Sequence, residues 1–163
     1  MKLIRRIAAA VATVLVLSSC GLLQGGTTTT TTANAGTTGS DTGNALAAIF
    51  NIFKTTGNID LSNITNIINL GKILTGAKSL ANSTATYTQE FADGLIQGSS
   101  QLVNKENVNS VIEKLKSLAA VNTTAISNAA TKAYAGTAPK LSSSTAGVGQ
   151  TESILKDIFG EIK

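Results

Sequence analysis

Apolar residues recur along residues 43–162 at the three- and four-residue spacing of an amphipathic helix. The repeat predicts five or six short helices, within residues 43–56, 60–81, 84–103, 105–120, 122–134 and 152–162. A strand would need strict alternation, which fails at the Ile67–Ile68 pair. Gly71 or Gly76 is a point at which the second helix can bend or split. The pattern therefore predicts an all-α fold, a small bundle forming one domain.

Residues that commonly cap helices stand at several of the predicted ends. Asp41 and Thr42 precede the first predicted helix, where N-caps belong, and Gly57 follows it, where a C-cap belongs. The segment 136–150 breaks the helical period and contains the only proline of the chain, so we expect a loop there.

The last predicted helix carries an apolar stripe that is too hydrophobic to remain in water alone. The stripe consists of Ile154, Leu155, Ile158, Phe159 and Ile162. Packing into the core of the same bundle is the favoured interpretation. Because a Gly- and Ser-rich segment separates this helix from the rest, the stripe is also the candidate partner-facing element.

The first twenty residues follow a different pattern. A short basic segment with Lys2, Arg5 and Arg6 precedes an unbroken run of apolar and small residues over 7–17. At about 1.5 Å of helical rise per residue, the run is too short to span a hydrocarbon core of about 30 Å. It predicts a secretory signal rather than a permanent membrane helix.

This run ends in Leu17-Ser18-Ser19-Cys20, which resembles the lipobox of bacterial lipoproteins. The resemblance covers residues 1–20. It implies that residues 1–19 are removed as a signal peptide and that lipid is attached to the Cys20 sulfur. Two or more acyl chains would hold the protein on a membrane without a transmembrane helix. Gly21 follows, which within that class resembles an outer-membrane address in a bacterial cell envelope. Residues 21–26 lack the acidic cluster that resembles a surface-export signal in some members of the class, which favours the periplasmic face over the surface.

Residues 20–42 consist mainly of Thr, Gly, Ala and Ser, with one charged residue. Such a segment buries too little apolar surface to offset the entropy of ordering it. We therefore expect a flexible tether between the lipid and a helical domain at residues 43–163.

The composition limits the kinds of catalytic and metal sites that the chain can form. The 163 residues include no His and one Cys, which removes the commonest general base and any multi-thiolate metal site. Without the three basic residues of the signal, ten Lys stand against nine Asp and Glu. The near-neutral charge indicates no nucleic-acid partner, and we expect neither metal nor cofactor.

Two short patterns resemble catalytic or phosphate-binding motifs but are incomplete. Residues 71–79 approach a P-loop, but Ala77 inserts one residue before the lysine and no apolar strand precedes the motif. Ser153 and Lys156 match the S-x-x-K spacing of serine enzymes that bind penicillin, without the other motifs of that class. A helix with close-contact glycines and a chance match are the better explanations.

Two further pairs of residues lie one helical turn apart. Glu90 and Asp93 form a candidate carboxylate pair, for which a solvated helix face is the favoured interpretation. Gly94 and Gly98 have the spacing that lets a neighbouring helix approach closely, which in a bundle predicts either a tight crossing or a local weak point.

Together these features predict a membrane-anchored lipoprotein of the cell envelope whose helical domain is not an enzyme. The domain would bind or scaffold, and an envelope protein is the candidate partner. The alternative is a carrier that holds an apolar small molecule or a lipid between its helices.

Overall fold

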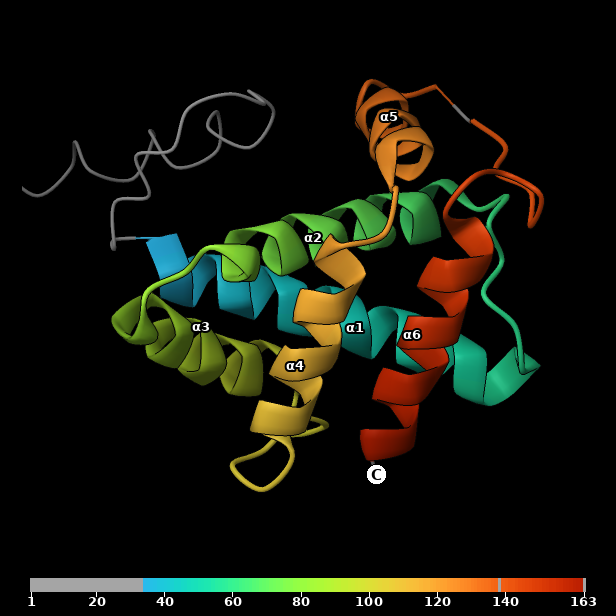
Figure 1. Ribbon diagram of the computed structural model, residues 1–163. Coiled ribbons are helices and arrows are strands. Elements are labelled where there is room, and N and C mark those ends of the chain that lie inside the picture. Colours follow the sequence, from blue (N-terminus) through green and yellow to red (C-terminus); the bar gives the residue numbers. More distant parts are fainter. Residues whose placement is uncertain (1–33, 138, 163) are drawn as a thin grey trace, which may run out of the picture.

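The computed structural model of the protein describes residues 34–137 and 139–162. These residues form six α-helices and no strand (Figure 1), which confirms the predicted all-α fold. The helices are α1 (Ala35–Thr56), α2 (Ile64–Ala81), α3 (Ala85–Gly98), α4 (Val108–Ala119), α5 (Thr124–Tyr134) and α6 (Val148–Glu161).

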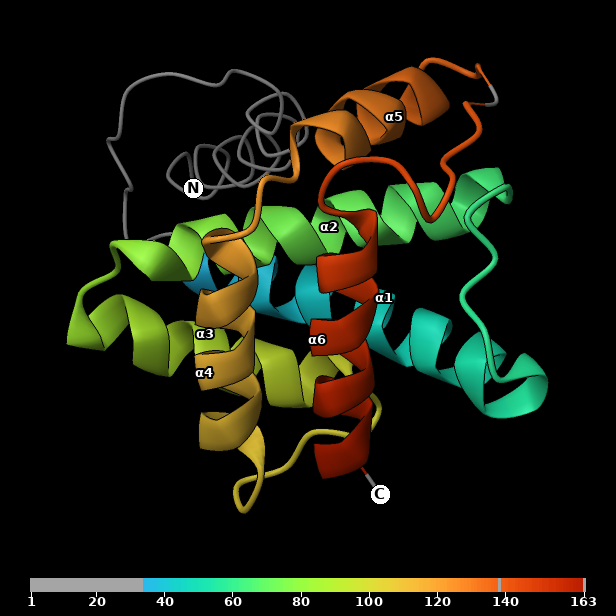
Figure 2. The same cartoon turned by 45° about the vertical axis from the view of Figure 1, so that its right-hand side comes forward.

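The helices surround one main hydrophobic core. α1 packs against both α2 and α3, and α2 also contacts α4 and α5. α4 and α6 stand side by side across the α1–α2 pair, while α5 lies on the outer side of α2 (Figures 1 and 2). All six helices contribute buried side chains to this core. Its large, fully buried members include Leu46, Ile49, Ile73, Phe91 and Leu115.

The first helix begins earlier than its hydrophobic pattern predicts. α1 starts at Ala35, so residues 35–42 form its first two turns instead of the end of a tether. Asp41 and Thr42 consequently lie inside the helix and do not cap it, and the Thr42 hydroxyl donates to the Thr38 carbonyl at 2.7 Å. Gly57 does end the helix as predicted, with φ of 72° and its N–H donating to the Phe53 carbonyl.

A seam of glycines explains why this Gly- and Thr-rich stretch is helical. Gly39 and Gly43 of α1 pack directly on the backbone of α3, and Gly94 and Gly98 of α3 pack directly on the backbone of α1. At all four positions a Cβ atom would collide with the backbone of the opposite helix. The intrinsic helix propensity of this sequence is low, so packing on α3 holds the first turns of α1 in place. The tight crossing predicted for the α3 glycines is confirmed. We call these four glycines the α1–α3 seam.

Local polar contacts set the ends of α2 and α3. α2 begins at Ile64 because the Asn63 side chain accepts from the Thr65 N–H at 2.9 Å. It is continuous across both of its glycines, each of which leaves room for a neighbouring helix. α3 ends at Gly98, since Ser100 and Gln101 adopt left-handed φ angles of 53° and 73°.

The apolar stripe of α6 packs into the core of its own bundle. Leu155 and Ile158 are fully buried, Ile162 is 4% exposed, and Ile154 is half-buried against the same cluster. The Phe159 ring lies 5.5 Å from that of Phe50 and 5.2 Å from that of Phe53, both on α1. The core-packing interpretation is therefore confirmed, and the assignment of these five residues as partner-facing is wrong.

Candidate functional site

The predicted lipidation site falls outside the described residues. Cys20 and the signal segment 1–19 precede Asn34, the first described residue. Within the described ranges, the helices are either too short or too polar to cross a bilayer.

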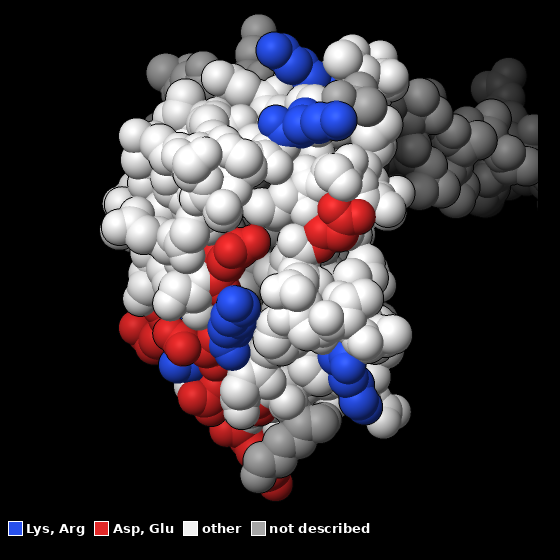
Figure 3. Space-filling model, turned by 90° about the vertical axis from the view of Figure 1, so that its right-hand side faces the viewer, with Lys and Arg blue, Asp and Glu red and all other residues white. Residues whose placement is uncertain are grey.

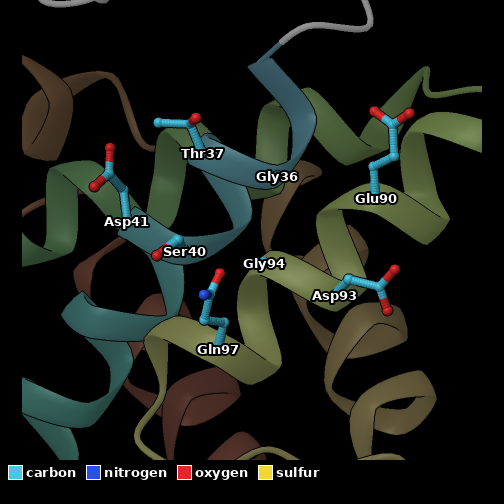
Figure 4. Close-up of a pocket in the computed structure, with 8 residues that line it drawn as sticks. All are labelled: Gly36, Thr37, Ser40, Asp41, Glu90, Asp93, Gly94 and Gln97. Atoms are coloured by element: carbon cyan, nitrogen blue, oxygen red, sulfur yellow. The ribbon is translucent and has the colours of Figure 1, made fainter.

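An open groove lies beside the α1–α3 seam. It encloses about 650 Å³. α1 supplies one wall and α3 the other (Figure 4). The lining residues are Gly36, Thr37, Ser40, Asp41, Glu90, Asp93, Gly94 and Gln97. The groove exists because Gly36 and Gly94 bring the two backbones into contact, so that the flanking polar side chains form its rims.

The carboxylates of this groove do not converge. Asp41 stands on the α1 wall, whereas Glu90 and Asp93 stand on the α3 wall and point away from Asp41 (Figure 4). Asp93 is exposed and accepts a hydrogen bond from the Gln89 side chain at 3.3 Å. A pair of carboxylates performs acid–base catalysis when burial drives their pKa values apart. An open groove with diverging carboxylates does not supply that environment.

A second, smaller hollow of about 210 Å³ lies where the N-terminal end of α4 meets the end of α6. Asn107 lines it and has a structural role, because its Nδ2 donates to the carbonyls of Leu102 at 3.2 Å and Glu161 at 3.0 Å. Its Oδ1 accepts from the N–H of Asn104 at 2.8 Å. Neither hollow is lined by an apolar side chain, and a carrier of apolar ligands requires such a lining.

The pKa values of Tyr134 and Asp60 depart from the ordinary values of these side chains. Burial, followed by the negative charge of Asp41, raises the pKa of Tyr134. Hydrogen bonds from the Ser62 hydroxyl and then from the Ser62 N–H lower the pKa of Asp60, which lies before α2. In residues 34–137 and 139–162, no three Cys, Asp or Glu side chains are grouped so that they could hold a metal ion.

Neither motif-like pattern forms the site that it resembles. Residues 71–79 lie inside α2, so their backbone N–H groups are used within the helix and do not form a phosphate-binding loop. Ser153 and Lys156 are both exposed on α6, away from its buried stripe.

Sequence reasoning identifies three of the eight residues that line the groove, Glu90, Asp93 and Gly94. It places Gly36, Thr37, Ser40 and Asp41 in the tether or at a cap, and it does not single out Gln97. A signal for the groove was available in the spacing of Gly36, Gly39 and Gly43, which matches a helical face and complements the predicted crossing at the α3 glycines.

Comparison of the chain with models of protein families, with curated proteins and with solved structures finds no match.

Proposed function

We propose that the protein is a lipoprotein of the bacterial cell envelope, anchored through a lipid on Cys20. Its helical domain acts as a non-enzymatic binding or scaffolding module at the membrane surface. The outer membrane is the proposed site, with the domain on the periplasmic face.

One observation on the sequence supports the proposed lipid anchor. The only cysteine of the chain stands directly after a basic segment, an apolar run and two small residues. A thiol at that place is the nucleophile that thioether formation requires, and small residues before it suit a peptidase cleft. Acyl chains would then give stable attachment without a membrane-spanning helix.

The composition supports a binding role over catalysis. The chain has no His, the side chain that most often serves as general acid or base near neutral pH. The two polar hollows present hydroxyl, amide and carboxylate groups to solvent. Such surfaces suit contacts with another macromolecule rather than chemistry on a small substrate.

Metabolic labelling with a clickable palmitate tests the anchor. The full chain, expressed in a bacterium, should carry the label and fractionate with membranes. Cys20→Ser should abolish the label and release the protein from the membrane fraction. Ser19→Ala is the matched control, because Ala is also small and leaves the thiol in place, and it should retain both label and fractionation.

Two results would overturn the proposal. One is an unlabelled wild-type chain, and the other is a Cys20→Ser protein that still fractionates with membranes through a route independent of the thiol.

A further inference from the structure

Charge is divided between two parts of the domain. α2, α5 and the segment 135–147 that follows α5 contain four Lys and no Asp or Glu. The other described residues contain five Lys and all nine acidic residues of the chain. The near-neutral total therefore conceals one basic region and one acidic region.

The four lysines belong to α2, α5 and the segment after α5, the elements that form a small apolar cluster where α5 packs on α2. Lys78 of α2 reaches α5, with its Nζ 3.4 Å from the Ser127 hydroxyl. Lys72 directly follows Gly71, whose backbone faces the Ala130 methyl group of α5. Lys132 belongs to α5 itself. Lys140 precedes Leu141, which packs on the cluster formed by Ile67, Ala129, Ala130 and Ala133.

The view from the side shows the same division. At the top of Figure 3, at the height of α5 in Figure 1, the coloured side chains are basic. Acidic side chains lie from the middle of the molecule to the bottom, where further basic side chains stand among them.

An exposed aromatic side chain accompanies these lysines. Tyr134, at the end of α5, is 51% exposed and is the one large hydrophobic side chain that the described residues leave exposed. Tyrosine concentrates at membrane–water interfaces because its ring is apolar and its hydroxyl is polar. We call Lys72, Lys78, Lys132, Lys140 and Tyr134 the lysine face.

We propose that the lysine face docks on the surface of an anionic phospholipid bilayer. The inference rests on the proposed lipid anchor, which would hold the domain beside that bilayer. Lysine ammonium groups would contact lipid phosphates, and Tyr134 would enter the headgroup region. The acidic part of the domain would then face away from the membrane, where like-charge repulsion is smallest.

The strength of such docking fits a tethered protein. Each lysine near an anionic surface strengthens binding about fivefold at most, and salt weakens the effect. Four lysines give weak binding in free solution. A lipid anchor raises the local concentration of the bilayer, so weak docking suffices to orient the domain.

Two acidic residues border the lysine face. Burial and then the negative charge of Asp41, on α1, raise the pKa of Tyr134. Asp60 precedes Leu61, whose carbonyl accepts from the Leu141 N–H at 3.4 Å, so it flanks the segment that carries Lys140.

Vesicle flotation tests the docking without the lipid. The probe is the chain from residue 20 to 163 with Cys20→Ser, and the vesicles contain equal parts phosphatidylglycerol and phosphatidylcholine at low salt. This chain should float with those vesicles and not with pure phosphatidylcholine. Replacing Lys72, Lys78, Lys132 and Lys140 by Gln should weaken the binding at least about tenfold.

The chain offers a matched control with the same loss of charge. Replacing Lys54, Lys105, Lys116 and Lys156 by Gln removes four lysines outside the lysine face and should leave vesicle binding within about twofold. Equal losses in both variants would show attraction of the whole protein rather than docking, and would overturn the proposal. Failure of the unaltered lysines to bind anionic vesicles would also overturn it.

A fluorescent reporter tests the geometry even if the lysine variant folds poorly. The chain has no Trp, so Tyr134→Trp introduces a single tryptophan, whose emission should shift to the blue on anionic vesicles. Asn109→Trp, an exposed position on α4, should not shift. A shift at Asn109→Trp alone would place a different face on the membrane. Because the flotation and fluorescence assays omit the lipid, they can fail while Cys20 labelling succeeds, and the reverse.

Discussion

The α1–α3 contact and the α2–α5 contact both rely on small residues, yet they differ in what touches. In the α1–α3 seam, the backbones of the two helices are in direct contact. There is no space for a Cβ atom at Gly39, Gly43, Gly94 or Gly98. Between α2 and α5, the Gly71 backbone faces only the methyl group of Ala130. The first contact is fixed by main-chain atoms and the second by one side chain.

The surroundings of the two contacts differ as well. α1 and α3 contribute Leu46, Ile49, Phe91 and Leu95 to the main core, all fully buried. α5 contributes Ile126 to that core and otherwise forms a separate cluster of alanines with α2. The α1–α3 seam therefore joins two helices that build the main core, whereas α5 packs on the outer side of the bundle.

The largest effect is expected from adding one methyl group to the seam. In Gly94→Ala the Cβ would meet the carbonyl oxygen of Gly36, which neither helix can move without separating. We expect a loss of about 3 kcal/mol of unfolding free energy, the upper end for overpacking. Urea denaturation followed by circular dichroism measures it.

Gly160→Ala is the control for that substitution. Gly160 lies in α6 with nothing near the position of a new Cβ. The same methyl group should there stabilise the protein by about 0.5 kcal/mol, because Ala favours helix over Gly. Equal destabilisation at both sites would show that the seam is not tightly packed.

A smaller effect is expected where α2 meets α5. In Gly71→Ala the new Cβ would lie 2.5 Å from the Ala130 Cβ, and α5 can shift to relieve that contact. We expect a cost of about 1–2 kcal/mol. Ala130→Gly removes the opposing methyl group, so the double variant should be more stable than the sum of the single effects predicts, by about 1 kcal/mol. Strict additivity in this double-mutant cycle would contradict the contact.

Amide hydrogen exchange through local unfolding should distinguish α5 from α1 and α3 in the unsubstituted protein. Because α5 packs mainly on α2 and adds little to the main core, its amides should exchange with deuterium at least about tenfold faster than those of α1 and α3. Hydrogen exchange followed by mass spectrometry resolves the helices separately. Equal protection of α5 and α3 would show that the domain opens only as a whole.

Sequence pattern predicted the parts of this fold that apolar periodicity controls. The helix predicted over residues 105–120 is α4 at Val108–Ala119, and the apolar stripe of the last predicted helix is the buried face of α6. In both, large aliphatic residues repeat at helical spacing, so the face that must leave water is visible in the sequence alone.

The first two turns of α1 could not be found in that way. Residues 35–42 offer Gly, Thr and Ser, whose own preference is against helix, and their partner Gly94 lies far along the chain. The groove could not be predicted from the apolar pattern either, because the positions of Asp41 and Gln97 depend on how the backbones of α1 and α3 cross. The direction of the Glu90 and Asp93 side chains also depends on the tertiary structure. Their spacing predicts that the two carboxylates lie one turn apart on a helix, but not that they point away from Asp41.

The smallest effect concerns Tyr134, where α5 comes within electrostatic reach of α1. Burial and then Asp41 raise the pKa of this tyrosine, so the folded state holds the proton more tightly than the unfolded chain. Its stabilising contribution is therefore complete below the unfolded pKa of about 10 and declines as pH rises through the folded pKa.

With Tyr87→Phe, one of the two tyrosines remains, and its phenolate absorbance reports on Tyr134 alone. Asp41→Asn should bring the pKa of Tyr134 part of the way back, because burial remains. Asp93→Asn, on the other wall of the groove, should leave it unchanged, and equal shifts in the two variants would mean that α5 does not sense α1 through Asp41.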